Sequence, residues 1–290
     1  MSLKKIIRRN LNNLMEGIED GRPDLKYYAF DWDDNILIMP TEIMLVTDEG
    51  YEVGMSTEDF AEYRHKIGVE DFEYSKGNNT YTISNYSEDP YRNFSVSGDK
   101  RFILDSMIAE TGPSWNDFVE CINGGSIFAI ITARGHTPKI LEESIYNLIT
   151  KDHKGISKQL LIKNLKEYRN LSGEKLGDDI QLIKDYLSLC KYHPVTYGEG
   201  SASNPEEGKI KAFKEFISYI KEMSEKLGKK AYVKNDIKNN FIPMTNKPKL
   251  GFSDDDPKNI ESMKDFVDSN NPDDVDISMY LTKGGSKSNV

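Results

Sequence analysis

The chain has few of the residues that would place it among disulfide-stabilised, zinc-binding or membrane-spanning proteins. Its 290 residues include only two cysteines, Cys121 and Cys190. They lie far apart and form no C-x-x-C motif, so the sequence predicts neither a disulfide framework nor a zinc site. The longest apolar runs, such as 127–131, are much shorter than the roughly 18 residues of a membrane span. We therefore expect a soluble cytoplasmic protein that makes no membrane contact.

Positive charge is also in short supply. The chain carries 38 lysines and arginines against 48 aspartates and glutamates, which gives a net charge of −10. A protein that coats nucleic acid would have the opposite balance. The composition therefore disfavours a protein that coats nucleic acid, but it does not exclude an enzyme that acts on a nucleic-acid end.

The first residues have a helical pattern. Apolar residues recur at helical spacing in 1–24, alongside four basic residues, and no cleavable apolar core follows. The sequence predicts an amphipathic helix that packs on the core or on a second subunit of a homodimer. The alternative is a basic arm that contacts phosphate or lipid.

Acidic residues gather at two places, each directly after an apolar run of the β type. These are 28–35 (Tyr-Ala-Phe-Asp-Trp-Asp-Asp-Asn) and 250–257 (Leu-Gly-Phe-Ser-Asp-Asp-Asp-Pro). Two unit charges about 4 Å apart repel by roughly 4 kcal/mol at an effective dielectric constant near 20. Several carboxylates that meet at strand ends must therefore recruit a metal, a lysine or a proton. The sequence predicts a Mg²⁺ site.

Strand and helix patterns alternate along most of the chain, which is typical of an α/β fold with a parallel sheet. Thr137 is placed to cap a helix whose first residue is Pro138. The other predicted helices are 157–168, 178–189, 203–227 and one from 257. The predicted strands are 26–30, 126–132, 193–197, 249–253 and a late edge strand at 275–281.

A long segment interrupts this alternation. Between the first two core strands lie roughly 85 residues rich in Tyr, Asn, Ser and acids, which indicates an inserted domain and not a loop. Within it, Asp48-Glu49-Gly50 predicts a hairpin turn, and Ser56 predicts the start of a helix that continues to about residue 67. We expect a core of 25–45 and 126–283, an insert of 46–125 and a flexible tail of 284–290.

Four motifs in order resemble those of the haloacid dehalogenase (HAD) superfamily, whose members are mostly phosphatases and phosphotransferases. They are Phe-Asp-Trp-Asp at 30–33, Ile-Ile-Thr-Ala-Arg at 130–134, Gly-Lys at 208–209 and Phe-Ser-Asp-Asp-Asp-Pro-Lys-Asn at 252–259. The resemblance covers roughly 25–45 and 126–270. It implies a Rossmann-like three-layer sandwich with a parallel central sheet and a cap inserted after the first strand.

The resemblance also implies roles for the acidic residues. Asp31 would be the nucleophile that forms an aspartyl-phosphate, and Asp33 the acid and base that serves the leaving alcohol and then water. The carboxylates of Asp31 and Asp254 and the carbonyl oxygen of Asp33 would hold Mg²⁺, with Asp255 in support. The usual Gly-Thr after the two aspartates is replaced by Asp34 and Asn35.

Two further elements would bind the phosphoryl group. The hydroxyl of Thr132 and the backbone N–H of Ala133 would donate to phosphoryl oxygens, and Lys209 would supply positive charge. Lys211 and Lys214 lie nearby on the same predicted helix, so the choice of lysine stays open. We expect Arg134 and His136 to serve as a helix cap or to pair with a surface acid more readily than to read the substrate.

The expected activity is Mg²⁺-dependent hydrolysis of a phosphomonoester, with a small phosphorylated metabolite or a nucleotide as substrate. A first alternative is a nucleic-acid 3′-end phosphatase, which the acidic balance of the chain disfavours. A second alternative is a catalytically silent HAD-like module that binds a partner and keeps its carboxylates for metal-linked stability.

Overall fold

The computed structural model describes residues 26–172, 177–198, 204–230, 232–235, 240–243, 247–270, 274–283 and 286–290. The helix predicted at 1–24 lies outside the described residues. Among the residues that are described, no helix has the length and the apolar composition needed to cross a lipid bilayer.

The main sheet has six strands in the order β14-β13-β12-β1-β8-β9. The five strands from β13 to β9 are parallel, and β14 runs antiparallel to β13. The predicted α/β fold with a largely parallel sheet is therefore confirmed. The strands are β1 (Lys26–Phe30), β8 (Phe128–Thr132), β9 (Lys191–Pro194), β12 (Lys249–Asp254), β13 (Asp276–Lys283) and β14 (Ser286–Asn289).

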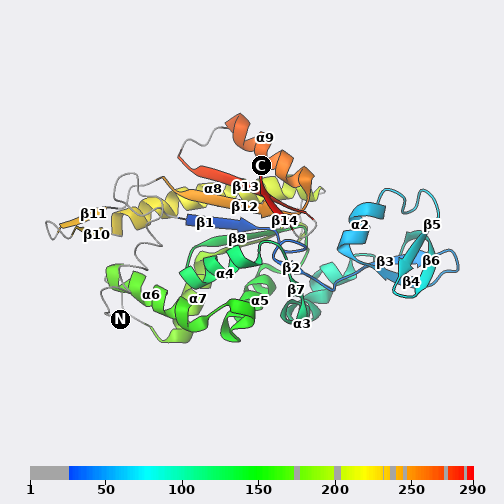
Figure 1. Ribbon diagram of the computed structural model, residues 1–290, viewed down its shortest axis with the longest axis horizontal. Coiled ribbons are helices and arrows are strands. Elements are labelled where there is room, and N and C mark those ends of the chain that lie inside the picture. Colours follow the sequence, from blue (N-terminus) through cyan, green and yellow to red (C-terminus); the bar gives the residue numbers. More distant parts are fainter. Residues whose placement is uncertain are drawn as a thin grey trace.

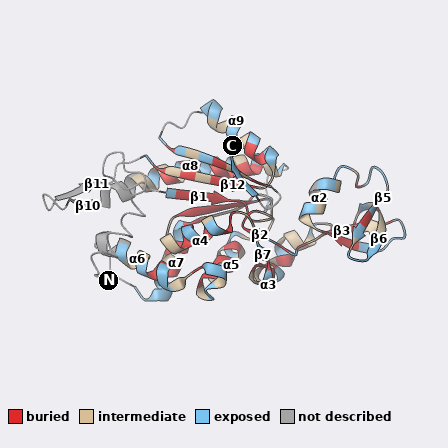
Figure 2. Cartoon of the chain, viewed as in Figure 1, coloured by how far each residue is buried: buried red, intermediate tan, exposed pale blue. Residues whose placement is uncertain are grey.

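Helices cover both faces of this sheet and make three layers (Figure 1). One face carries α3 (Asp99–Ile108), α4 (Trp115–Gly124), α5 (Pro138–Thr150), α6 (Lys158–Ser172) and α7 (Asp179–Leu189), and the other carries α8 (Pro205–Lys230) and α9 (Pro257–Asn270). All five residues of β8 are buried, which explains the continuous apolar run in its sequence. The buried residues line the two sides of the sheet in Figure 2.

Local signals place the helix starts well. The side chain of Thr137 accepts a hydrogen bond from the backbone N–H of Ile140, and Pro138 is the first residue of α5. Asp178 caps α7 in the same way through Gln181. The predicted helix starts at these positions are confirmed.

Two predictions at the strand level are wrong. The strand expected at 193–197 is β9, which begins two residues earlier and ends at Pro194. Residues 286–289, expected to belong to a flexible tail, form β14, so β13 is not the edge strand. Every residue of β14 is exposed, and it is held by backbone hydrogen bonds and by Lys287, whose Nζ lies 2.6 Å from Asp117 Oδ2. A polar strand of this kind leaves no periodic apolar signal.

The insert contains its own four-stranded antiparallel sheet, in the order β4-β3-β6-β5, set apart from the main sheet in Figure 1. The predicted hairpin is confirmed, with Gly50 at a φ of 84° in its turn. Ser56 caps the short helix α2 (Thr57–Tyr63), which ends four residues before the predicted end. The strands are β3 (Ile43–Thr47), β4 (Glu52–Met55), β5 (Phe72–Lys76) and β6 (Asn79–Tyr86).

The insert's own apolar cluster contains residues from 43 to 94. It begins three residues before the predicted insert of 46–125 and ends well before residue 125. Helices α3 and α4 pack on the main sheet through side chains that include Phe102 and Phe118. The remaining elements are β2 (Leu37–Ile38), β7 (Glu110–Thr111), β10 (Tyr232–Asn235), β11 (Asn240–Pro243) and the 3₁₀ turns η1 (Arg92–Phe94), η2 (Val96–Gly98) and η3 (His153–Gly155).

Candidate functional site

The two acidic clusters meet because β1 and β12 are adjacent parallel strands. Phe30 pairs with Ser253 at their carboxyl ends, and the backbone N–H of Asp31 donates to the Ser253 carbonyl at 3.0 Å. From β1 the sheet continues through β8 on one side and through β12 on the other. Ligands of open α/β sheets bind at such a point, where the strand order reverses.

Three carboxylates could hold a metal ion. Asp31, Asp254 and Asp255 each offer one oxygen, and these oxygens all lie within 4.8 Å of one another. Asp31 is 4% exposed and Asp254 is fully buried. Oδ1 of Asp31 is buried without a hydrogen-bond partner, although buried polar atoms are normally satisfied. An orphaned carboxylate oxygen among other hard oxygen donors fits a cation such as Mg²⁺.

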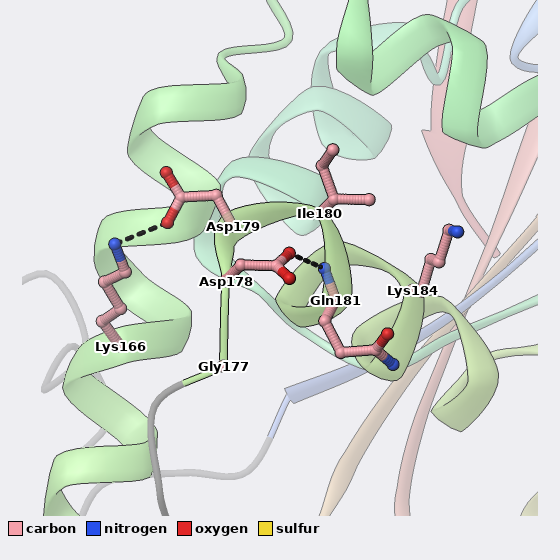
Figure 3. A pocket seen from close by; sticks show the side chains of 7 residues that line it. All are labelled: Lys166, Gly177, Asp178, Asp179, Ile180, Gln181 and Lys184. Atoms are coloured by element: carbon pink, nitrogen blue, oxygen red, sulfur yellow. Dashed lines mark hydrogen bonds and ion pairs between the residues drawn. The ribbon is translucent and has the colours of Figure 1, made fainter.

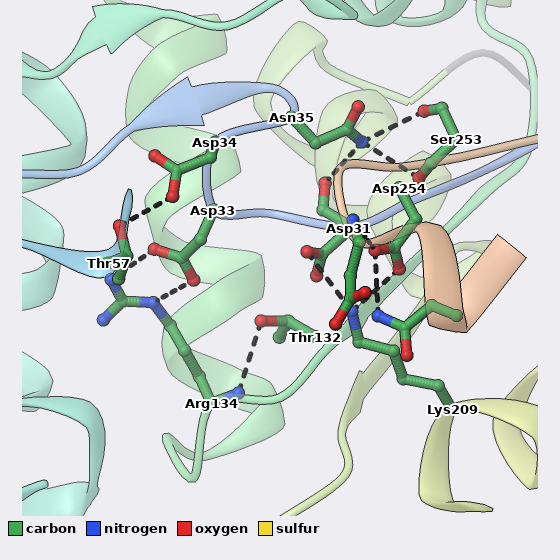
Figure 4. Close-up of polar contacts among 12 residues, drawn as sticks. Asp31, Asp33, Asp34, Asn35, Thr57, Thr132, Arg134, Lys209, Ser253 and Asp254 are labelled. Atoms are coloured by element: carbon green, nitrogen blue, oxygen red, sulfur yellow. Dashed lines mark hydrogen bonds and ion pairs between the residues drawn. The ribbon is translucent and has the colours of Figure 1, made fainter. Parts of the chain in front are cut away.

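Lys209 is the lysine that reaches this cluster. Its buried Nζ lies 2.8 Å from Oδ2 of Asp254 and 3.3 Å from Oδ2 of Asp31 (Figure 4). Lys211 and Lys214 are exposed on the same helix, α8, and Nζ of Lys214 lies over the ring of Phe266. Of these three lysines, Lys209 is therefore the one in contact with the carboxylates, and its binding of a phosphoryl group stays a prediction.

The charges of the cluster are not balanced. Burial raises the pKa of Asp31 well above its usual value, Lys209 lowers it, and Asp254 raises it further. Burial and the neighbouring Asp254 raise the pKa of Asp255 to about 7. Burial lowers the pKa of Lys209, but Asp254 and Asp31 outweigh burial and raise it above its usual value. One lysine faces three carboxylates, so the cluster favours a further cation or bound protons.

Hydrogen bonds fix the direction of the Asp254 side chain. Its Oδ1 accepts from the backbone N–H of Asp256 at 3.0 Å and from Nδ2 of Asn259 at 2.9 Å, while Oδ2 accepts from Lys209. Asn259 is buried in the first turn of α9. Asn259, five residues after Asp254, thus helps to hold the Asp254 carboxylate in one orientation.

Asn35 ties together the ends of three strands. Its fully buried side chain donates through Nδ2, which lies 3.0 Å from each of three oxygens: the Asp31 carbonyl, the Ser253 carbonyl and Ser253 Oγ. Its Oδ1 accepts from Oγ1 of Thr282 on β13 at 3.0 Å. Asn35 therefore holds the loop that carries Asp31 against the strand that carries Asp254.

Asp34 occupies the position at which the resembled family usually has glycine. Its φ of 52° lies in the left-handed region, which glycine enters freely and Asp tolerates better than most residues. Its Oδ2 accepts a hydrogen bond from Oγ1 of Thr57, the first residue of α2, at 2.7 Å. Burial raises the pKa of Asp34 to about 6, against the lowering effect of that hydrogen bond. The replacement is therefore compatible with the turn, and it contacts the insert.

The carboxylate of Asp33 does not join the cluster of three carboxylates. Arg134 holds it in a two-pronged ion pair, in which Nε donates to Oδ2 at 2.7 Å and Nη2 donates to Oδ1 at 2.6 Å (Figure 4). Arg134 is 1% exposed and is not a helix cap, and its partner is no ordinary surface acid. The expected role of Arg134 is therefore wrong.

Thr132 and Ala133 lie at the carboxyl end of β8, beside β1. The Oγ1 of buried Thr132 accepts from the backbone N–H of Arg134 at 3.3 Å, which leaves the hydroxyl proton free to donate. Ala133 is exposed, and its carbonyl accepts from Oγ1 of Thr196 at 2.8 Å. Their predicted contacts with a phosphoryl group stay predictions.

An open cavity of about 740 Å³ lies elsewhere, between α6 and α7 (Figure 3). Three of its four charged residues have partners: Nζ of Lys166 lies 2.6 Å from Oδ1 of Asp179, and Asp178 caps α7. It contains none of the residues of the carboxylate cluster. The lining residues are Lys166, Gly177, Asp178, Asp179, Ile180, Gln181 and Lys184.

Comparisons of the chain with protein-family models, with curated proteins and with solved structures find no match. The interpretation of the site therefore depends on its own geometry. Sequence reasoning identified the carboxylates and Lys209, and it missed the positions of Asn35 and Arg134 in the site. The sequence places Asn35 directly after Asp34 and Arg134 just after a buried strand, but it carries no signal of the distant partners that these side chains contact.

Proposed function

We propose that the protein is a Mg²⁺-dependent phosphomonoester hydrolase that uses Asp31 as its nucleophile. The observation that carries the proposal is the buried Asp31, which has one oxygen without a partner and shares Lys209 with Asp254. The strand order supports it, because β8, β1 and β12 are neighbours and their carboxyl ends carry Thr132, Asp31 and Asp254. Residues from the four sequence motifs thus meet at the carboxyl edge of the parallel sheet, as the resemblance would require.

The metal would be held by Asp31, Asp254 and Asp255. When bound, Mg²⁺ neutralises the charge of the phosphoryl oxygens, so that a carboxylate can approach phosphorus. Lys209 then keeps the Asp31 carboxylate in place and adds positive charge for the transferred group. The hydroxyl of Thr132 and the N–H of Ala133 would donate hydrogen bonds to the phosphoryl oxygens.

The reaction proceeds in two displacements. In the first, an Asp31 oxygen forms a bond to phosphorus, the bond from phosphorus to the ester oxygen breaks, and Asp33 gives its proton to the leaving alcohol. In the second, water attacks the phosphorus of the aspartyl-phosphate and gives a proton to Asp33. The bond from phosphorus to Asp31 breaks, which releases phosphate and restores the Asp31 carboxylate and the protonated Asp33.

The insert would act as a cap that selects small substrates. It follows the first strand and touches the site loop directly, since Thr57 donates to Asp34. Residues 43–94 contain eleven acidic and four basic side chains. Such a surface repels a long polyanion. This balance favours a small phosphorylated metabolite or a nucleotide over a nucleic-acid end.

The test is phosphate release from p-nitrophenyl phosphate and from a panel of nucleotides and sugar phosphates, with Mg²⁺ or with EDTA. We expect release that needs Mg²⁺ and is lost in Asp31→Asn. The matched control is Asp48→Asn, which removes an exposed aspartate of the hairpin turn and should retain activity. If Mg²⁺ stabilises the protein but no phosphate is released from any substrate, the hydrolase proposal is wrong and a catalytically silent binding module is favoured.

A further inference from the structure

We infer that Arg134 is a positioning residue that orients Asp33 for proton transfer and links that orientation to the insert. The inference rests on the proposed function. Arg134 comes from the loop after β8, and its guanidinium grips both oxygens of Asp33 from the buried side, at 2.6 and 2.7 Å. The Asp33 side chain is 16% exposed and that of Arg134 is 1% exposed. The Asp33 carboxylate thus lies at the edge of the site, whereas the Arg134 guanidinium that holds it is buried.

The rest of the guanidinium is held on every side. Nη2 also donates to Oγ1 of Thr41 at 2.9 Å, and Nη1 lies 3.2 Å from Nε2 of His136. Because a guanidinium can only donate, that histidine nitrogen is the acceptor, and Nδ1 of His136 donates to Oδ1 of Asp99 at 2.9 Å. The rings of Phe94 and Phe102 lie 4.6 and 5.0 Å from Cζ of Arg134.

This enclosure leaves Arg134 a single conformation. A planar fork with two fixed bonds to one carboxylate sets the direction of that carboxylate as well as its distance, which a lysine could not do. A general acid must lie within hydrogen-bond reach of the leaving oxygen, so its orientation decides its efficiency. The arrangement is therefore suited to hold Asp33 in one direction at the edge of the site.

Arg134 also meets both connections between the core and the insert. Thr41 precedes the first strand of the insert, and Phe94 follows its last strand. The next residue, Gly135, donates its backbone N–H to the Phe94 carbonyl at 2.7 Å. Hence the direction of Asp33 and the placement of the insert depend on the same side chain.

The test uses substrates that differ in their need for a proton. An alkyl phosphate has a poor leaving group that needs general-acid help, whereas p-nitrophenolate leaves without it. In Arg134→Lys and Arg134→Gln we expect kcat/KM to fall about 100-fold for an alkyl phosphate and less than about fivefold for p-nitrophenyl phosphate. Thr41→Val, which removes one support of Arg134, should give a smaller loss with the same selectivity.

The control is Arg92→Gln. Arg92 makes an exposed two-pronged ion pair with Glu52 within the insert, so its loss should leave kcat/KM unchanged for both substrates. Equal losses on both substrates, or no loss, would overturn the inference while the hydrolase stands. A wild type that releases no phosphate from either substrate would overturn the hydrolase and this inference together. If Arg134→Gln does not fold, Arg134→Lys and Thr41→Val decide the question.

Discussion

Replacing Asp31 by asparagine should stabilise the metal-free protein, although the residue is buried and in an ion pair. The three carboxylate oxygens lie within 4.8 Å of one another, so each of the two repulsions that Asp31 feels amounts to at least about 3.5 kcal/mol at an effective dielectric constant of 20. Its attraction to Lys209 at 3.3 Å is about 5 kcal/mol on the same scale. Asparagine removes both repulsions and one attraction, a net gain of about 2 kcal/mol.

The assay is thermal unfolding of wild type and Asp31→Asn at pH 8, in EDTA and in excess Mg²⁺. In EDTA we expect the Tm of the variant to be higher by about 4 °C, since 1 kcal/mol shifts the Tm of a chain of this size by about 2 °C. Mg²⁺ should raise the Tm of the wild type more than that of the variant, because the variant lacks one ligand. A variant that is less stable than wild type in EDTA, or that gains equally from Mg²⁺, would refute this account of the cluster.

Three further predictions concern the pH dependence, the strand ends and the tail. In EDTA the wild type should lose stability as the pH rises from 6 to 8. The cause is the folded-state pKa of Asp255, which at about 7 lies above its unfolded value, so the folded chain binds the proton more tightly. The measurement is Tm across this pH range, and Mg²⁺ should reduce the fall of Tm with pH. Asn35→Leu leaves the Thr282 hydroxyl and the carbonyls of Asp31 and Ser253 without their buried partner, so urea unfolding should show a loss of about 3 kcal/mol together with weaker Mg²⁺ stabilisation. Lys287→Ala removes a surface ion pair of β14 and should cost less than about 1 kcal/mol in the same assay.

The core of the fold could be predicted because its signals are local. A parallel strand that is buried on both faces needs a continuous apolar run, as at β8, and a helix start needs a capping side chain, as at Thr137. The carboxylates of the site could be predicted for the same reason, since each acidic cluster directly follows its own strand. The outer strand β14 could not, because its exposed polar residues carry no periodic pattern.

The polar contacts of the site are a different matter, since they join residues that only the sheet order brings together. Arg134 and Asp33 are 101 positions apart, and Asn35 and Thr282 are 247 positions apart. The sequence shows that each residue is polar and follows a strand. It does not show that β1 lies between β8 and β12. Without that strand order, the sequence does not indicate which of the many acidic residues pairs with an arginine that follows β8.

The two halves of the site differ in their charge balance, and this difference bears on where a cation could bind. Asp33 already has a buried cationic partner in Arg134, and this pair needs no metal to offset its charge. In the other half, Lys209 offsets only one of the three charges of Asp31, Asp254 and Asp255. The two negative charges that remain match one divalent cation, and Asp31 Oδ1 is the oxygen without a partner. A second lysine or a monovalent ion would leave a buried charge uncompensated, which a protein interior tolerates poorly.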